Sequence, residues 1–445
     1  ECFGDIGVRD GKVAAIGSRL PDAASEIDAG GRLVTPGGVD AHCHIDEPPY
    51  MNARLADDFR SASRSAACGG TTTIVPFINQ LAGASLAAAR DDYRERARSS
   101  LIDYGFHFIL KSDDPDRLRT ELPPLLANGL RSVKVFMTYD GYMMSDDAIL
   151  QVMEMVRAVD GVVMVHAENG HCAHHITSSL HAHGRNGLSN FAESSPEAIE
   201  REAVHRAITL AELTGVRLMI VHVSGDQAME QIRWSRHRGH RTLAETCPQY
   251  LVDLEPHLHS DGWETAKYVC MPPVRPKFHT GDLWRGVMAG DIDLISSDHC
   301  PYRFEGETGK KAFGSPKVGE VPPGLPGLET RLPLFYEAAV ASGRISERRF
   351  VDLTATTPAR LYGLYPRKGS LLPGSDADIT IWETGPREIR HADLHDACDY
   401  TPYEGRTVSA WPVITLSRGE VVWSQDEDFV SDAYGRGSFV SGPAC

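Results

Sequence analysis

The sequence predicts an α/β fold, a (β/α)8 TIM-type barrel joined to a small β-sandwich domain that both chain ends build. Three observations favour it. Short apolar runs rich in β-branched residues alternate with helical stretches, which is typical of a parallel sheet covered by helices. The alternation gives eight strand–helix units, and eight parallel strands close a barrel. The two ends of the chain carry instead short strands separated by turns.

The expected strands follow from the apolar runs: Val39–Ile45, Thr71–Phe77, Tyr104–Leu110, Ser132–Met137, Val162–Glu168, Arg217–Val223, Arg241–Cys247 and Ile292–Asp298. Apolar residues at helical spacing predict helices between them, among them Ser85–Ser99, Asp146–Val159 and Pro196–Leu213.

The chain ends predict a second, smaller domain. Asp10-Gly11 lies between strand-forming residues and predicts a tight hairpin, and Gly369–Trp423 contains further short strands. We therefore expect residues 1–35 and 367–425 to form the β domain, 36–366 the barrel and 426–445 a loosely packed tail or intersubunit arm. Because the chain opens at Glu1 in mid-pattern, we expect an upstream strand and a start methionine before it.

Composition narrows the class of protein. The chain has 445 residues, 42% of them hydrophobic, and a formal net charge of −16, which argues against nucleic acid and anionic membrane as partners. No apolar run approaches the ~20 residues of a membrane span, and no signal peptide is visible. Nine cysteines without a CxxC pair indicate reduced thiols. These features predict a cytoplasmic enzyme.

Polar residues stand where five of the expected strands end, which is where barrel enzymes place their chemistry. The first strand ends in "VDAHCHID", whose two histidines are two residues apart and so face the same side. The set comprises His42, His44, Lys134, His166, His222 and Asp298. A single such histidine is more often a core residue, a single aspartate as often caps a helix, and Lys134 alone could extend to solvent. The whole set in this order indicates a metal site.

Imidazole and carboxylate are ligands for zinc and similar cations. Lys134 is the unusual member, because a buried ammonium ion is costly and tends to lose its proton. A neutral amine can add carbon dioxide to give a carbamate, an anion able to bridge two cations. We therefore expect one metal at His42, His44 and Asp298 and a second at His166 and His222, with carboxylated Lys134 joining them. The pair would share a bridging hydroxide, with Asp298 accepting its proton.

Beyond these residues, the chain resembles the dihydropyrimidinase and D-hydantoinase family of the cyclic amidohydrolases along nearly its whole length. The matching stretches are "GGVDAHCHID", "GGTTTIVPF", "SVKVFMTYDGY", "VHAENG", "HVS", "AETCPQYL", "KYVCMPPVR", "SSDHCP" and "LYPRKGSLLPGSDADITIW". The resemblance implies hydrolysis of a ring amide C–N bond in a hydantoin, dihydropyrimidine or related imide or ureide. It also implies two divalent ions, zinc first with manganese or cobalt as alternatives, N6-carboxylysine at Lys134 formed from carbon dioxide or bicarbonate, and a homotetramer. It gives Tyr139 the role of hydrogen-bonding the carbonyl oxygen that becomes anionic.

Two departures from the family pattern fall in the substrate pocket. Met271 stands in "CMPPVR" where the family commonly has serine, and Pro323 stands in "VPPGLPG" where it commonly has asparagine. Proline has no backbone N–H, so a donor to the substrate is lost at this position. The pocket is therefore expected to be more apolar than usual and to favour a substituted hydantoin or a cyclic imide over dihydrouracil.

Several alternatives remain. Glu47-Pro48 matches allantoinases, so another ring such as allantoin or a xenobiotic imide stays open. Dihydroorotases typically carry an arginine after the HxH pair, and "HCHIDEPPY" has none. A non-catalytic scaffold relative is a third alternative, although such relatives lose metal ligands and this chain keeps all six. The histidines within 171–183 lack fixed ligand spacing and are expected to form a solvated or interface segment. No nucleophile elbow or phosphate loop is present.

Overall fold

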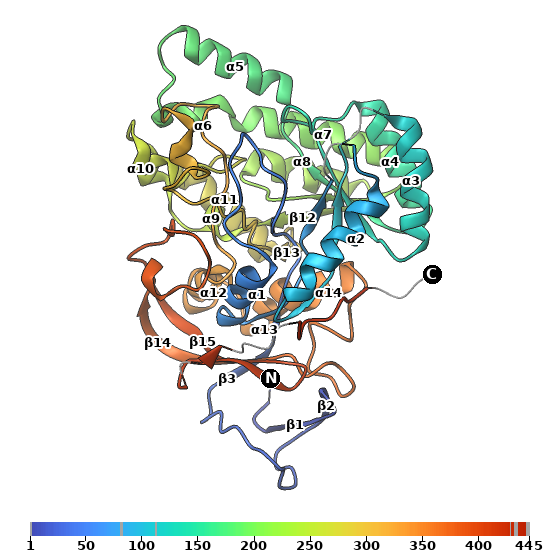
Figure 1. Cartoon of the computed structure of the whole chain (residues 1–445), viewed down its shortest axis with the longest axis vertical. Coiled ribbons are helices and arrows are strands. Elements are labelled where there is room, and N and C mark those ends of the chain that lie inside the picture. The colour runs from blue at the N-terminus through green and yellow to red at the C-terminus, as the bar shows by residue number, and fades with distance from the viewer. Residues whose placement is uncertain (1, 81–82, 112–113, 428, 431–434, 442–445) are drawn as a thin grey trace.

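The computed structural model describes residues 2–80, 83–111, 114–427, 429–430 and 435–441. It confirms the predicted α/β class: parallel strands curl around a core with helices outside them, and an antiparallel β layer lies at one end (Figure 1). Every expected barrel strand has a counterpart: β4 (Gly38–Asp40), β5 (Thr71–Ile74) and β6 (Phe77–Asn79), β7 (Asp103–Tyr104) and β8 (His107–Ile109), β9 (Ser132–Phe136), β10 (Val162–His166), β11 (Arg217–Ile220), β12 (Thr242–Thr246) and β13 (Leu294–Ile295).

The second and third expected strands are each divided into two. The gap between β5 and β6 contains Pro76, which has no N–H to give to a ladder. The neighbouring strand is interrupted beside it, at Gly105 and Phe106, yet His107 still donates its N–H to the carbonyl of Pro76. The parallel strands therefore form two groups, β4-β5-β7 and β13-β12-β11-β10-β9-β8-β6.

The barrel closes at the predicted metal residues. Beyond β13 the chain runs parallel to the residues that follow β4, with Cys43 opposite His299. The Asp298 N–H donates to the His42 carbonyl at 2.9 Å, and the His44 N–H donates to the His299 carbonyl at 2.7 Å. The backbone bonds that join the first strand to the last thus fix three candidate ligands relative to one another.

Most of the helices pack around the barrel, while α5 extends away from it at the top of Figure 1. In chain order they are α1 (Phe59–Cys68), α2 (Leu86–Arg96), α3 (Pro115–Ala127), α4 (Asp146–Arg157), α5 (Gly170–Ala182), α6 (Phe191–Ser194), α7 (Glu197–Thr214), α8 (Asp226–His237), α9 (Pro248–Leu251), α10 (Trp263–Ala266), α11 (Lys277–Ala289), α12 (Arg331–Tyr336), α13 (Glu347–Val351) and α14 (Thr357–Leu361). Local chemistry sets several of their ends. Asp58 and Ser145 cap α1 and α4 with their side chains, and Gly215 ends α7 in the left-handed conformation. The three helices named from the sequence correspond to α2, α4 and α7.

Both ends of the chain contribute to the β layer, as expected. Its five antiparallel strands run in the order β17 (Phe429–Val430), β16 (Glu420–Ser424), β15 (Thr407–Ser417), β14 (Ile379–Glu388) and β3 (Leu33–Pro36). The hairpin of β1 (Asp5–Arg9) and β2 (Lys12–Gly17) turns at Asp10 and Gly11, whose φ angles are +52° and +72°. Two consecutive positive φ values are what the predicted tight turn requires. The exact domain boundaries stay a prediction.

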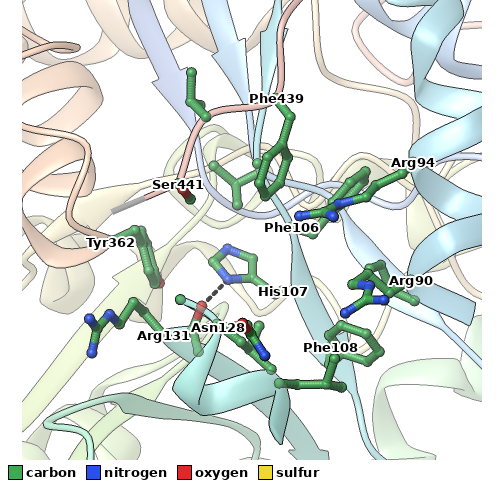
Figure 2. A pocket seen from close by; sticks show the side chains of 18 of the residues that line it. Arg90, Arg94, Phe106, His107, Phe108, Asn128, Arg131, Tyr362, Phe439 and Ser441 are labelled. Atoms are coloured by element: carbon green, nitrogen blue, oxygen red, sulfur yellow. Dashed lines mark hydrogen bonds between the residues drawn. The ribbon is translucent and has the colours of Figure 1, made fainter. Parts of the chain in front are cut away.

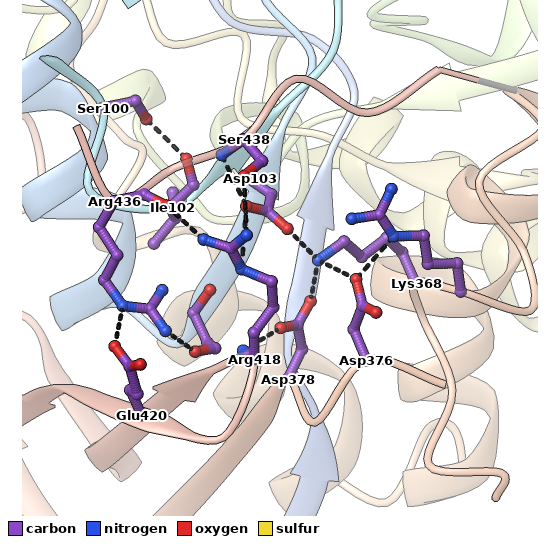
Figure 3. A network of polar contacts seen from close by, with 12 residues as sticks. Ser100, Ile102, Asp103, Lys368, Asp376, Asp378, Arg418, Glu420, Arg436 and Ser438 are labelled. Carbon is purple, nitrogen blue, oxygen red and sulfur yellow. Dashed lines mark hydrogen bonds and ion pairs between the residues drawn. The ribbon is translucent and has the colours of Figure 1, made fainter. Parts of the chain in front are cut away.

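A buried ion network ties this layer to the barrel (Figure 3). Lys368 Nζ lies 2.5 Å from a carboxylate oxygen of Asp103, 2.7 Å from one of Asp378 and 3.0 Å from one of Asp376. The N–H of Ser438 donates to Asp103 at 2.8 Å, so part of the C-terminal segment is held against the barrel. Three acids around one buried lysine fix the two layers in one relative position.

In the described part of the chain, no helix is long and apolar enough to cross a membrane.

Candidate metal centre

The segments that follow the first barrel strand, β4, and the last, β13, bring three of the predicted ligands together. His42 Nε2 lies 3.0 Å from Asp298 Oδ1, and His44 Nε2 lies 3.4 Å from the same oxygen. One ligand atom from each residue lies within 4.8 Å of the other two. Two imidazoles and one carboxylate at this spacing can hold a zinc-type cation and leave a position open for water.

Lys134 lies beside this group. Its Nζ is 2.8 Å from His42 Nε2 and lies over the rings of Phe77 and Phe136, at 4.5 and 5.0 Å from their centroids. The side chain is fully buried, and burial lowers the pKa of Lys134 from its ordinary value although Asp298 and other acids oppose the shift. The structure thus places an amine whose charged form is disfavoured by burial next to His42, in the lining of the cavity that His44, His166 and His222 also reach.

The second histidine pair consists of His166, the last residue of β10, and His222, two residues after β11. The ring centroids of His166 and His222 are 4.4 Å apart, and His222 lies 5.5 Å from His42. Burial lowers the pKa of His166 and lowers that of His222 well below its ordinary value, so both stay neutral, as a metal ligand must be. Among the described residues, neither ring nitrogen of buried His222 has a hydrogen-bond partner. A bound cation would satisfy one of them, so the residues present fit a second metal ion.

Three glutamates that the sequence did not single out as site residues support the histidines. Glu245 lies 2.5 Å from His42 Nδ1, Glu47 lies 2.6 Å from His44 Nδ1, and Glu168 lies 2.7 Å from His166 Nε2. A carboxylate behind a ligating imidazole fixes its tautomer and orientation. Their signal was present in "HIDEPP", "VHAENG" and "AETCP", but nothing in a single sequence pairs Glu245 with His42 across the barrel.

The charges of the centre attract a cation. Burial alone would raise the pKa of Asp298, but His42 and His44 hold it well below its ordinary range, so the group is a carboxylate. Burial works against a charge on His44, yet Glu47 and Asp298 raise its pKa to about 9. The same anionic surroundings that favour a proton here favour a metal ion in its place.

Three of the predicted site residues have a backbone conformation that L-residues rarely adopt. The φ angles of Tyr139, His222 and Asp298 are +70°, +40° and +50°. Such strain costs on the order of 1–3 kcal/mol per residue and is concentrated at functional sites. In this protein, the three residues with this backbone conformation all line one cavity.

That cavity, of about 90 Å³, receives the predicted substrate residues as well. Tyr139, Met271 and Pro323 line it together with Tyr50 and Tyr142, above Lys134, His166, His222 and Asp298. Burial raises the pKa of Tyr139 well above its ordinary value, so its hydroxyl keeps the proton. The structure thus brings every predicted site residue to one place.

Two other features lie away from it. A larger cavity of about 330 Å³ lies at the opposite end of the barrel, beside the residues that precede β8 and β9 and under Phe439 (Figure 2). His107, at its edge, bonds to Ser132 and Ala41, and burial lowers its pKa to about 3, which describes a satisfied core histidine. The histidines within 171–183 lie on and just after α5 and are half-buried or exposed, at the top of Figure 1.

Comparison with known proteins agrees with this geometry. The model of the amidohydrolase family matches residues 33–422. The chain is 41% identical to a D-hydantoinase of Ralstonia pickettii, covering 94% of this chain and 91% of the relative, and 38% identical to one of Streptomyces coelicolor, covering 100% and 96%. The crystal structure of a dihydropyrimidinase from Brevibacillus agri superposes with a TM-score of 0.94 at 36% identity, covering 99% of this chain and 95% of the other.

These similarities extend over both layers of the fold and confirm the resemblance that the motifs predicted. A family model that spans most of the chain, and relatives of nearly equal length, leave no segment of the barrel outside the match. The chain therefore belongs to the amidohydrolase family.

Proposed function

We propose that this protein hydrolyses the C–N bond of a cyclic amide, in a hydantoin, a dihydropyrimidine or a related ring. One observation carries the proposal. His42, His44, Lys134, His166, His222 and Asp298 converge beneath one cavity that also contains a protonated tyrosine. The D-hydantoinases and dihydropyrimidinase that the chain resembles over its full length support the same reaction class.

We propose two divalent cations at this centre, zinc first and manganese or cobalt as alternatives. His42, His44 and Asp298 would hold one, and His166 and His222 the other. When bound, two such ions supply an activated water nucleophile at neutral pH and polarise the carbonyl group. Lys134, carboxylated by carbon dioxide or bicarbonate to N6-carboxylysine, would join the two halves of the site. Two observations support this role of Lys134: its side chain is buried, and its Nζ lies beside His42.

The protein's own residues would handle the proton and the developing charge. An oxygen of Asp298, held as carboxylate, can accept the proton of the attacking water and pass it to the leaving nitrogen. The Tyr139 hydroxyl can donate a hydrogen bond to the carbonyl oxygen as that oxygen becomes anionic. Glu245, Glu47 and Glu168 would keep the imidazoles in place.

The lining of the cavity favours a ring with an apolar substituent. Tyr50, Tyr142 and Met271 offer aromatic and thioether surface, and Pro323 offers no N–H. We therefore propose a substituted hydantoin as the preferred substrate over dihydrouracil. Glu47-Pro48, the allantoinase-like pair, keeps allantoin or a xenobiotic imide as the second candidate.

One experiment separates these alternatives. Metal content per chain is measured by elemental mass spectrometry, and ring opening of a substituted hydantoin, dihydrouracil and allantoin is assayed on the same sample. About two metals with hydantoin opening supports the proposal, while opening of allantoin alone would move the substrate to the second candidate. A protein that stays inactive with metal and bicarbonate would contradict catalysis and favour a scaffold.

We also propose a homotetramer, for which light scattering should give a mass of four times 48.7 kDa.

A further inference from the structure

We propose that Cys68, Glu329 and His395 form an additional metal site, separate from the centre in the barrel, that takes a borderline divalent cation such as Zn²⁺. Cys68 ends α1, Glu329 precedes α12, and His395 lies between β14 and β15. One ligand atom from each lies within 4.8 Å of the other two. Within the described ranges, only this group and the one containing His42 meet that condition.

The three side chains are already close to a coordination geometry. The ring nitrogen Nδ1 of His395 lies 3.0 Å from Glu329 Oε1, and the backbone N–H of His395 donates to Glu329 Oε2 at 2.9 Å. Tetrahedral zinc, with bonds of about 2.3 Å to sulfur and about 2.0–2.1 Å to nitrogen or oxygen, places its ligand atoms about 3.5 Å apart. The His395–Glu329 pair would therefore widen by about 0.5 Å, and the Cys68 sulfur, which lies within 4.8 Å of both partners, would approach by no more than about 1.3 Å.

The backbone permits this approach because of one glycine. A Cβ at Gly69, the residue after Cys68, would lie 2.3 Å from the carbonyl oxygen of Glu329. Any other residue would push the end of α1 away from the segment before α12, and the Cys68 thiol with it. Gly69 thus keeps the sulfur within range of the Glu329–His395 pair.

Burial and charge also suit a divalent cation. Cys68 and Glu329 are 0% and 1% exposed, while the His395 side chain is 18% exposed and offers a route for the ion and for a water ligand. A bound divalent cation would displace the thiol proton of Cys68, and the resulting thiolate and the Glu329 carboxylate together would supply two negative charges to it. Arg64 and Arg387 act on the same sulfur, so the cation shares these anions with two guanidinium groups. Sulfur, imidazole and carboxylate together favour zinc-type ions over magnesium or calcium.

The position of the site indicates a structural role. The ring of His395 packs edge-on against Trp423 of β16 at 5.0 Å, and α1 and α12 lie next to β14 and β15 (Figure 1). A cation here would connect a barrel helix, the segment before α12 and the β layer. Because it binds only the folded arrangement, it would stabilise the docking of the two layers. The inference does not depend on the proposed reaction.

Cobalt substitution of the whole protein tests the site, because a thiolate bound to Co²⁺ gives a near-ultraviolet charge-transfer band. The proposed barrel ligands contain no sulfur, so the band requires a cysteine outside that set, and Cys68→Ser tests whether it is Cys68 rather than another free cysteine such as the exposed Cys172. We expect the wild type to show the band. Cys68→Ser should lose both the band and one of the bound cobalt ions per chain, whereas Lys134→Ala should keep the band. Cys300→Ser, which removes a thiol at the barrel cavity, should also retain it.

Two results would overturn the inference: a cobalt-loaded wild type without the band, or a band that survives Cys68→Ser. Should Cys68→Ser fail to fold, His395→Gln gives the same test, since its partly exposed side chain tolerates the change. His395→Gln must then lose the band and one cobalt per chain. Loss of catalytic activity alone would leave the band intact, so failure of the proposed reaction is distinguishable from failure of this site.

Discussion

The hydroxyl of Tyr139 offers the sharpest test of the catalytic proposal. Tyr139→Phe removes one oxygen and keeps the ring, whose centroid lies 5.0 Å from that of His166 and 6.0 Å from those of Phe136 and Tyr50. Burial raises the pKa of Tyr139 well above its ordinary value, so the hydroxyl donates throughout the neutral range. The substitution therefore removes a hydrogen-bond donor while the packing around it stays.

The size of the effect follows from that single donor. Removal of one donor to a developing oxyanion lowers kcat by about 10²- to 10³-fold. Because a metal ion would share the same oxygen, we expect the lower end of the range, about 10²-fold, which corresponds to about 2.7 kcal/mol of transition-state stabilisation. The interaction is made mainly in the transition state, so KM should change little.

Steady-state opening of a substituted hydantoin gives kcat and KM, and elemental mass spectrometry of the same sample gives metal content. Tyr142→Phe is the matched control, since Tyr142 lines the same cavity but its hydroxyl accepts a bond from Asn79 at 2.9 Å. Its kcat should keep the order of magnitude of the wild type. A Tyr139→Phe enzyme within about 3-fold of wild-type kcat, a difference below about 1 kcal/mol, would refute the role of this hydroxyl.

Further predictions concern the ligands and the ion network. Lys134→Ala should lose bound metal and turnover together, and a variant that keeps full occupancy and activity in the same metal and turnover assays would contradict the bridging carbamate. Glu245→Gln should weaken metal binding by about 10- to 100-fold in a competition titration, because it loosens the orientation of His42; unchanged affinity would make Glu245 a bystander. Burial opposes the charge on Asp376, but Lys368 and other cations lower its pKa from 3.8 to about 2, so its stabilising contribution is complete above pH 3.8 and is lost as the pH falls towards 2. The difference in unfolding midpoint between the wild type and Asp376→Asn should therefore shrink over that interval, and a constant difference would contradict the ion-pair interpretation.

The sequence alone determined the class of fold and the candidate metal residues, because both depend on local pattern. Alternating apolar strands and helices located the eight strand regions, and Asp10-Gly11 located the first hairpin. The two-residue spacing of His42 and His44 placed both on one face. Parallel strands end at the same side of a barrel, so polar residues at strand ends had to converge wherever those ends meet.

Tertiary structure decided what depends on contacts between distant segments. Closure of the barrel brings Asp298 to His42 across more than half of the chain, and it places Glu245, 203 residues from His42, behind the same imidazole. The second expected strand is interrupted at Pro76 and the third beside it, at Gly105 and Phe106, although the apolar pattern runs on through both. The approach of Cys68 to Glu329 and His395 likewise depends on how α1 packs against the β layer. A periodic pattern specifies which face of an element is buried but not which partner it meets, and that partner is set by the packing of the whole chain.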